Sequence, residues 1–325
     1  MALQQLMAGI SGFTGILILI LDGKTAIHGA AEGINLCIQT IIPALFPFFL
    51  FSILLTGSFV GSPLPILRPI GKLFRIPKDA ESILIASFLG GYPVGAQAIS
   101  VAYRNGQLAK GDAQRMLAYC SNAGPSFLFG IIAFMFPGAK DPWILWAVHI
   151  LSAWMVSRLF SEPSSDAKSG KSGIAISTAM TSAVKTMAYV CGWVVLFRVI
   201  LAFVDRWFFF MMNTPWQIAI SGILELSNGC CGLNQIENTA LRFAICSGML
   251  ALGGICVTMQ TASVTHGLSI KYYLIGKLLQ CMFSLILSLS YIFQAYWIPI
   301  LLVTYFGFFS GKIKNSGSNP QKAVV

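Results

Sequence analysis

Long apolar blocks separated by short polar connections run along most of this chain. A membrane-spanning helix needs roughly 20 predominantly apolar residues. On this basis the pattern predicts spans at 1–21, 34–60, 143–160, 186–204, 272–293 and 297–310. The first has no Lys or Arg before it, unlike a signal peptide, so we expect an uncleaved membrane helix. A polar connection over 22–32, or a short interfacial helix, follows it.

Two further apolar runs, 82–89 and 96–103, are each too short to cross a bilayer. A corner rich in glycine and proline joins them, Gly90-Gly91-Tyr92-Pro93. Irregular backbone at membrane depth is tolerated only where protein or a water-filled cavity satisfies its polar groups. The pattern therefore predicts a re-entrant helical hairpin over 80–103, whose corner lines a path through the membrane.

A second interruption lies inside the apolar stretch 112–136, at Ser121-Asn122-Ala123-Gly124-Pro125-Ser126. Proline favours the first turn of a helix, and Gly, Asn or Ser favours the cap before it. We therefore expect this span to unwind over 121–124 and to restart at Pro125. The hairpin corner restarts its second half-helix near Pro93 by the same arrangement.

The second half of the chain repeats this order of elements. Residues 215–240 resemble a hairpin with Asn-Gly-Cys-Cys-Gly (228–232) at its corner, and the apolar stretch 241–263 is interrupted at Gly253-Gly254. Such a repeat is typical of transporters that hold their solute between two halves. The predicted fold is an all-α polytopic membrane protein with inverted-topology repeats, two re-entrant helical hairpins and two broken transmembrane helices. Its parts are an N-terminal half (1–160), a polar linker (161–173), a C-terminal half (174–311) and a polar tail (312–325).

Composition supports this interpretation. The chain has 325 residues, of which 56% are hydrophobic and 10% charged, against about 25% charged in a soluble domain. The net charge of +10 comes from Lys and Arg scattered between apolar runs, which fits juxtamembrane positions better than a nucleic-acid surface. The eight cysteines form no C-x-x-C and no Cys/His cluster, so we expect no metal site and no cofactor.

Charge also sets the predicted orientation, because Lys and Arg gather on the cytoplasmic side. With the basic loop 68–78 inside, the linker 161–173, Lys271, Lys277 and the tail also fall inside. The basic residues left outside are Lys24, Lys140, Arg206 and Arg242. The two halves then cross the membrane in opposite directions.

Glu225 and Arg198 are charged residues within apolar surroundings. A charge at membrane depth costs roughly 2.5 kcal/mol or more and is a functional candidate by default. We expect Glu225 to carry a coupling proton or cation. Arg198 is expected to be its partner, or else a counter-charge for an anionic solute. The alternatives are a structural Glu–Arg pair, or snorkelling to an interface.

The helix starts at Pro93 and Pro125 would present free backbone N–H groups and positive dipole ends, which suits an anionic or acceptor-rich solute. Ser121 and Asn122 are expected to add side-chain contacts. The simpler alternative is that the Gly and Pro residues only allow tight helix packing.

Two more polar residues lie near the breaks of the second half. Asn228 and Gln260 either line the same cavity or form hydrogen bonds across helices. Ser126 and His149 make only a weak nucleophile–base pair, so we do not expect an enzyme.

The motifs also resemble a known family. FLGGYPVGA at 88–96 and SNAGPSF at 121–127 are similar to segments of the YlbJ-type sporulation integral membrane proteins, as are IPALFPF at 42–48 and LGG at 252–254. The resemblance covers about 34–305. It implies membership of the nucleoside-recognition Gate-domain group, related in plan to nucleoside transporters and FeoB-like Gate domains. It also implies a solute site formed by Gly90–Pro93, Asn122–Pro125, Asn228 and Gly253-Gly254.

Together these observations predict a transporter of a small anionic or heteroaromatic solute, such as dipicolinate, in a bacterial inner membrane or a forespore membrane. Its expected partners are the solute, the lipid bilayer and a coupling proton or cation; a homo-oligomer stays open, and nucleic acid is not expected. The alternatives are a nucleoside transporter, or a structural membrane protein for spore-envelope assembly without transport. Four breaks converging on one polar cavity would favour a transporter, whereas dry packing would favour a scaffold.

Overall fold

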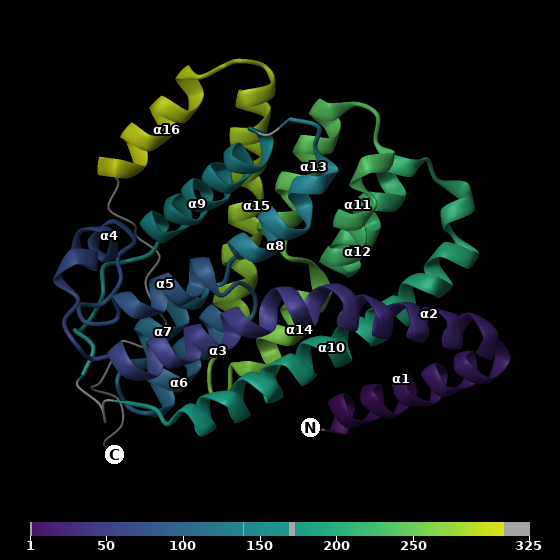
Figure 1. Ribbon diagram of the computed structural model, residues 1–325, viewed down its shortest axis with the longest axis horizontal. Helices are drawn as coiled ribbons and strands as arrows, with labels where there is room; N and C mark the ends of the chain where they lie inside the picture. The colour runs from purple at the N-terminus through teal and green to yellow at the C-terminus, as the bar shows by residue number, and fades with distance from the viewer. Residues whose placement is uncertain (1, 139, 169–172, 309–325) are drawn as a thin grey trace.

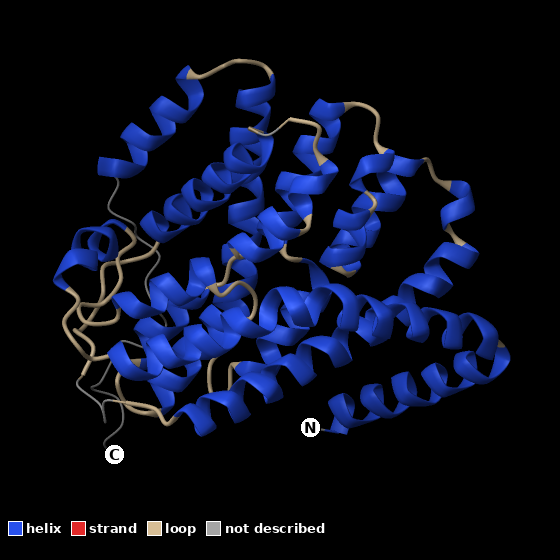
Figure 2. Ribbon diagram, in the orientation of Figure 1, coloured by secondary structure: helices blue, strands red, loops and turns tan. Residues whose placement is uncertain are grey.

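The computed structural model describes residues 2–138, 140–168 and 173–308. Within these ranges every regular element is a helix and no β-strand is present (Figure 2). The all-α prediction is therefore confirmed. Residues 169–172 of the predicted linker, and the predicted tail 312–325, lie outside the described residues.

One long helix from each half forms a pair along the longest dimension of the molecule (Figure 1). In the first half, α2 (Gly23–Leu36) continues through a π-helical turn (Cys37–Ile41) into α3 (Ile42–Phe59). In the second half the partner is α10 (Ile176–Trp207). The N-terminal helix α1 (Ala2–Leu21) packs on α2.

The segment 23–32 is helical, as the short-helix alternative expects, but it is the start of a longer helical segment that begins at Gly23. Asp22 caps this helix by accepting a hydrogen bond from the backbone N–H of Thr25 (3.4 Å), and its carboxylate pairs with Arg206 on α10 (3.2 Å). A Cβ at Gly29 would lie 2.9 Å from the Cβ of Ala202 on α10. Close packing on α10 therefore stabilises helix through a segment that is polar in sequence.

Between α3 and α10 in the sequence, the first half contains a set of short helices. They are α4 (Arg68–Leu73), α5 (Glu81–Leu89), α6 (Val94–Arg104), α7 (Lys110–Leu117) and α8 (Pro125–Gly130), followed by the longer α9 (Asp141–Leu159). α5 packs on α6, and residues 90–93 between them form the predicted corner. Residues 118–124 are not helical and α8 starts at Pro125, where the sequence predicts a restart.

The second half continues with six further α-helices after α10 in the described part of the chain. It contains α11 (Thr214–Leu224), α12 (Leu226–Cys231), α13 (Thr239–Leu252), α14 (Gly254–Val264), α15 (Lys271–Ile292) and α16 (Trp297–Phe308). The break between α13 and α14 falls at Gly253, which has a φ of +75°. The predicted position of the other corner is wrong: residues 226–231 are helical, and the chain turns at Glu225.

Packing explains why the Asn-Gly-Cys-Cys-Gly segment is helical. A Cβ at Gly229 would lie 2.3 Å from the Cα of Gly222, so the backbones of α11 and α12 touch at these two glycines. The glycines of this segment therefore serve helix contact, whereas Glu225 supplies the cap that α12 needs.

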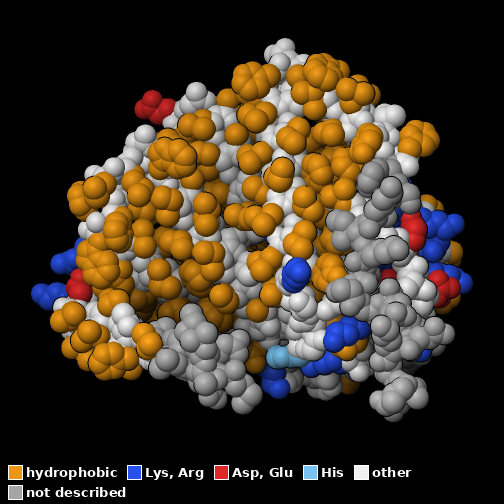
Figure 3. All heavy atoms as spheres, turned by 180° about the vertical axis from the view of Figure 1, so that it is seen from behind, with side chains coloured by type: hydrophobic (Ala, Val, Ile, Leu, Met, Phe, Trp, Pro, Cys, Tyr) orange, Lys and Arg blue, Asp and Glu red, His pale blue; other side chains and the backbone are white. Residues whose placement is uncertain are grey.

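Four helical segments of the described chain are long and apolar enough to cross a membrane: 23–59, 176–207, 239–264 and 271–292. The apolar helices 12–21 and 297–308 are shorter. Figure 3 shows a face on which hydrophobic side chains predominate and charged side chains lie mainly at the margin. Exposed apolar side chains of this size are expected where lipid replaces water, and they make this a multi-pass membrane protein.

The connections on one side of the molecule are held together by hydrogen bonds and an ion pair. The backbone N–H of Ala167 donates to the carbonyl of Lys78 (2.8 Å), and Arg75 pairs with Glu162 (2.9 Å). Burial lowers the pKa of the Arg75 guanidinium, and the Glu162 carboxylate opposes that change. The described part of the linker is thus fixed to the basic loop of the first half.

Other chain connections meet at the opposite end of the long helix pair. Arg206, at the end of α10, lies beside the start of α2, and Arg242 donates a hydrogen bond to the carbonyl of Met135 (2.7 Å). These two groups of connections correspond to those that the charge pattern assigns to opposite sides. Which group faces the cytoplasm stays a prediction.

Candidate functional site

The chain breaks of each half are in direct backbone contact. In the first half, a Cβ at Gly91 would lie 3.1 Å from the backbone N of Gly124. In the second half, a Cβ at Gly254 would lie 2.7 Å from the carbonyl oxygen of Gly222, at the end of α11. Only glycine allows these approaches, and Gly91 and Gly254 also have φ near +75° and +78°. Glycine at these positions therefore brings each half's two breaks together.

Tyr92 joins the breaks of the two halves. It follows Gly91 at the first corner, and a cis peptide bond links it to Pro93, the cap of α6. Its hydroxyl donates to the carbonyl of Leu250 near the end of α13 (2.9 Å). A Cβ on Gly253 would lie 3.5 Å from the Cζ of Tyr92. All four breaks thus lie around one point between the halves.

A small cavity of about 40 Å³ lies at this meeting point. Side chains of the π-helical turn, α3, α8, α10 and α14 form most of its walls, and the chain breaks contribute the rest. Its polar lining residues are Tyr92, Glu225, Ser227 and Gln260, and the backbone of Gly124 reaches it. Since one water needs roughly 10–15 Å³, the cavity has room for a few water molecules but not for an organic solute.

Glu225 is the charged side chain among the residues lining this cavity, and its side chain is buried. One carboxylate oxygen accepts hydrogen bonds from the backbone N–H and the side-chain amide of Asn228, at 2.7 and 2.8 Å. The same residue therefore caps α12 and faces the cavity. Gln260 faces it from α14 and donates to the sulfur of Cys256 (3.3 Å).

Asn122 and Ser121 brace the second break instead of lining the cavity. The Asn122 amide donates to the carbonyl of Tyr119 (2.7 Å) and to the hydroxyl of Ser87 (3.2 Å). Its oxygen accepts from Gln280 on α15 (3.0 Å). The backbone N–H of the next residue, Ala123, donates to the imidazole of His149 (3.1 Å). Pro125 is the first residue of α8, and Gly90 ends α5.

Comparison with known proteins adds one relative. The chain is 24% identical to the sporulation integral membrane protein YlbJ of Bacillus subtilis over 313 aligned positions, which cover 80% of this chain and 76% of YlbJ. This similarity over most of both chains supports a YlbJ-type assignment for the chain. No family model and no solved structure matches the chain.

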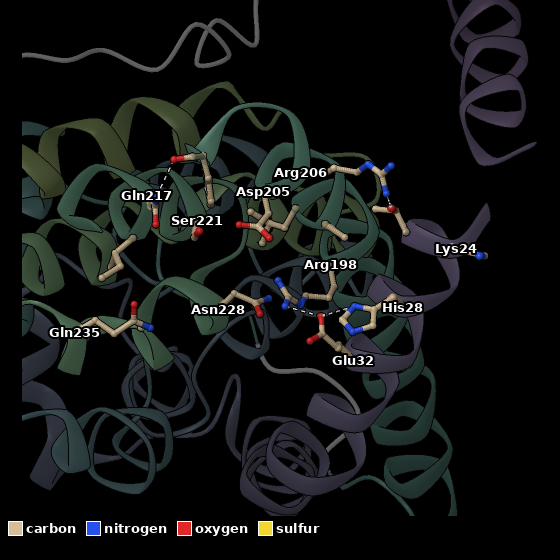
Figure 4. Close-up of a pocket in the computed structure, with 16 residues that line it drawn as sticks. Lys24, His28, Glu32, Arg198, Asp205, Arg206, Gln217, Ser221, Asn228 and Gln235 are labelled. Carbon is tan, nitrogen blue, oxygen red and sulfur yellow. Dashed lines mark hydrogen bonds and ion pairs between the residues drawn. The ribbon is translucent and has the colours of Figure 1, made fainter. Parts of the chain in front are cut away.

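A second and larger cavity of about 720 Å³ lies beyond Glu225, between α2, α10 and the α11–α12 pair (Figure 4). Asn228 lines this cavity while donating to Glu225, so it separates the two spaces. Charged and polar side chains surround the larger cavity: Lys24, His28, Glu32, Arg198, Asp205, Arg206, Gln217, Ser221, Asn228 and Gln235.

The predicted pairing of Arg198 with Glu225 is wrong. Arg198 bonds to Glu32 on α2 (2.6 Å), and His28 lies 3.5 Å from the same carboxylate (Figure 4). Arg198 faces α2 across the long helix pair, whereas Glu225 faces the small cavity. Glu32, which lies 166 positions from Arg198 in sequence, pairs with it, whereas the apolar pattern had indicated Glu225.

The predicted position of Lys277 is wrong. The charge pattern puts it at the cytoplasmic surface, but it is buried within α15, next to the breaks. Its ammonium donates to the backbone carbonyl of Ser121, to Gln280 (2.7 Å) and to the hydroxyl of Tyr92 (3.3 Å). The signal was available, because Gly276-Lys277-Leu278 is as apolar in context as the segment around Glu225.

The donor set around the site does not suggest a metal centre. No group of three or more His, Cys, Asp or Glu side chains in the described part of the chain is placed to hold a metal ion. The polar atoms at the breaks are backbone carbonyls, amides, hydroxyls, one carboxylate and one ammonium. Such a set can bind a polar organic solute and move a proton.

Proposed function

We propose that this chain transports a small anionic or heteroaromatic solute, with dipicolinate as the first candidate, across a bacterial membrane. The two halves act as Gate-type inverted repeats with two re-entrant hairpins and two broken helices, and the solute is held between them. The sporulation role in the name of YlbJ extends to this chain as part of the same proposal.

The observation that carries the proposal is that three of the four breaks line one cavity, while the fourth, at Gly253, contacts Tyr92 on its wall. Tyr92 and Gly124 come from the first half, and Glu225 and Gln260 come from the second. Irregular backbone in a membrane protein is expected where it lines a cavity or is buried in protein. A scaffold would not need polar groups from both halves to face the same space.

The ends of the hairpins support an inverted arrangement. The outer ends of α5 and α6 lie with the basic loop and the linker, since Gln107 donates to the carbonyl of Val60 (2.9 Å) and its own carbonyl accepts from Lys168 (2.9 Å). By contrast, Gln217 on α11 and Gln235 after α12 line the large cavity with Lys24, at the opposite end. Such opposite entry is the pattern of inverted-repeat transporters.

The small cavity corresponds to a closed arrangement, because a solute of dipicolinate size does not fit into about 40 Å³. The larger cavity provides an approach from the side of Lys24 and Arg206. Solute entry then requires Asn228 and Glu225, which separate the spaces, to move together with α12.

Glu225 determines how an anion would be accepted. An anionic solute and an ionised carboxylate repel each other in a space of low dielectric constant, so the solute binds when Glu225 carries a proton. Anion and proton would then move together. A nucleoside is the second candidate, because an ionised Glu225 and the Gln260 amide can both bind its hydroxyl and ring N–H groups.

The test is uptake of labelled dipicolinate or uridine by proteoliposomes containing the full chain, with and without a proton gradient. We expect dipicolinate uptake to depend on the gradient, and Glu225→Gln to lose that dependence. Glu237→Gln changes an exposed carboxylate shortly after the same hairpin and is the matched control. Uptake of neither solute would contradict the proposal and favour a scaffold; unchanged coupling in both Glu225→Gln and Arg198→Gln would remove the role of these charges.

A further inference from the structure

Lys277 is a buried cation that the proposed transport cycle leaves unused. It lies in the second turn of α15 with 2% of its side chain exposed. Among the residues that the structure describes, no carboxylate lies within ion-pair distance of its ammonium. An unpaired charge in this position is costly, so its neighbours must compensate for the lost water.

The neighbours of the Lys277 ammonium are neutral oxygens and aromatic faces. The three oxygens are the backbone carbonyl of Ser121, the amide oxygen of Gln280 (2.7 Å) and the hydroxyl of Tyr92 (3.3 Å). The ring centroids of Tyr92 and Tyr273 lie 5.1 and 5.9 Å from Nζ, within cation–π distance. Neutral oxygens and aromatic faces in this arrangement can accommodate a monovalent cation.

The Lys277 ammonium lies where the two halves of the chain meet. Two of its three oxygens come from the breaks of the first half, and Lys277 itself belongs to the second half. Tyr92 also donates to Leu250, and Gln280 donates to Asn122. A cation at this point therefore holds both corners of the first half against α13 and α15.

In transporters with broken helices, unwound backbone carbonyls commonly bind the coupling metal ion. Here the unwound carbonyl of Ser121 is taken by a side-chain ammonium. We propose that Lys277 is a built-in cation that replaces a coupling metal ion, so that solute transport by this chain is independent of Na⁺ and K⁺. This inference rests on the proposed transport function, and it leaves the proton at Glu225 as the coupling ion.

The first experiment does not need transport. The full-length protein is purified in detergent, and its melting temperature is compared in N-methylglucamine, sodium and methylammonium salts of equal ionic strength. We expect the wild type and Lys271→Ala to melt at the same temperature in all three, because Lys271 is an exposed lysine on the same helix. Lys277→Ala should melt several degrees lower in N-methylglucamine and recover most of that loss in methylammonium or sodium.

An equal melting temperature of Lys277→Ala in all three salts would overturn the proposal, because an emptied cation site should be refilled by a small cation. Lys277→Met covers the case in which the alanine variant does not fold, since methionine fills the same volume without the charge. We expect Lys277→Met to fold but to lose at least tenfold in solute uptake, whereas uptake at the wild-type rate would show that the charge is not needed.

The uptake assay tests whether transport depends on Na⁺ or K⁺. Wild-type uptake should change less than twofold when all Na⁺ and K⁺ are replaced by N-methylglucamine, and a requirement for either metal ion would overturn the proposal. If the wild type transports neither dipicolinate nor uridine, the transport function fails, while the melting experiment still decides whether Lys277 occupies a cation site.

Discussion

Gly95 offers a sharp test of how the first corner is packed. It lies in the first turn of α6, and a Cβ added there would lie 2.1 Å from the carbonyl oxygen of Cys120 and 3.0 Å from the Cα of Ser87. Both neighbours are backbone atoms, so no side chain can rotate away. We expect Gly95→Ala to force α6 and the 118–124 segment apart by about 1 Å, which overpacking data equate with a loss of roughly 1–3 kcal/mol or more.

The assay is thermal unfolding of the detergent-solubilised protein followed by size-exclusion chromatography, together with solute uptake. Gly192→Ala is the control, because an added Cβ meets nothing within 4 Å on this exposed position of α10. In a helix interior that exchange gains roughly 0.5–1 kcal/mol. The two variants should therefore shift the melting temperature in opposite directions. A Gly95→Ala protein as stable and active as the wild type would refute the close contact between α6 and Cys120.

Two other predictions concern side-chain bonds. Tyr92→Phe removes the hydroxyl that donates to Leu250 (2.9 Å), and leaving that buried carbonyl unpaired should cost roughly 1–3 kcal/mol in a melting experiment; an unchanged melting temperature would argue against this bond between the halves. Asp112 accepts from the backbone and hydroxyl of Ser164 at 3.0 and 2.7 Å, so Asp112→Asn should expose the linker to limited proteolysis, unlike Asp166→Asn on its exposed part. Equal cleavage rates in these two variants would show that Asp112 does not hold the linker.

Much of the fold follows from apolar runs and from punctuation by glycine and proline. The corner at 90–93, the restart of helix at Pro125 and the break at Gly253 all occur where the sequence predicts them. These breaks depend on local chemistry, since a missing N–H or a positive φ acts within a few residues. Local chemistry is what a single sequence records most directly.

The sequence predictions that are wrong concern residues whose position or partner depends on contacts distant in sequence. Gly229 was predicted at a corner, but it lies in the contact between α12 and Gly222 of α11. Arg198 pairs with Glu32 because α2 and α10 pack along their length. The charge pattern predicted a juxtamembrane position for Lys277, but two of the three oxygens around its ammonium come from residues more than 150 positions earlier. Residue type and spacing identify such groups as candidates, but the partner depends on packing.

The contact between α2 and α10 limits how the two halves can move. An added Cβ on Gly33 would lie 2.9 Å from the Cα of Val195, and one on Gly57, at the far end of α3, would lie 2.6 Å from Ile174. Helices in such close contact along their length can slide past each other by small steps, but separating them would lose the packing of both backbones. In the proposed transport cycle we therefore expect this pair to be the fixed side of the molecule, and the space at Glu225 to widen by movement of the short helices packed against it.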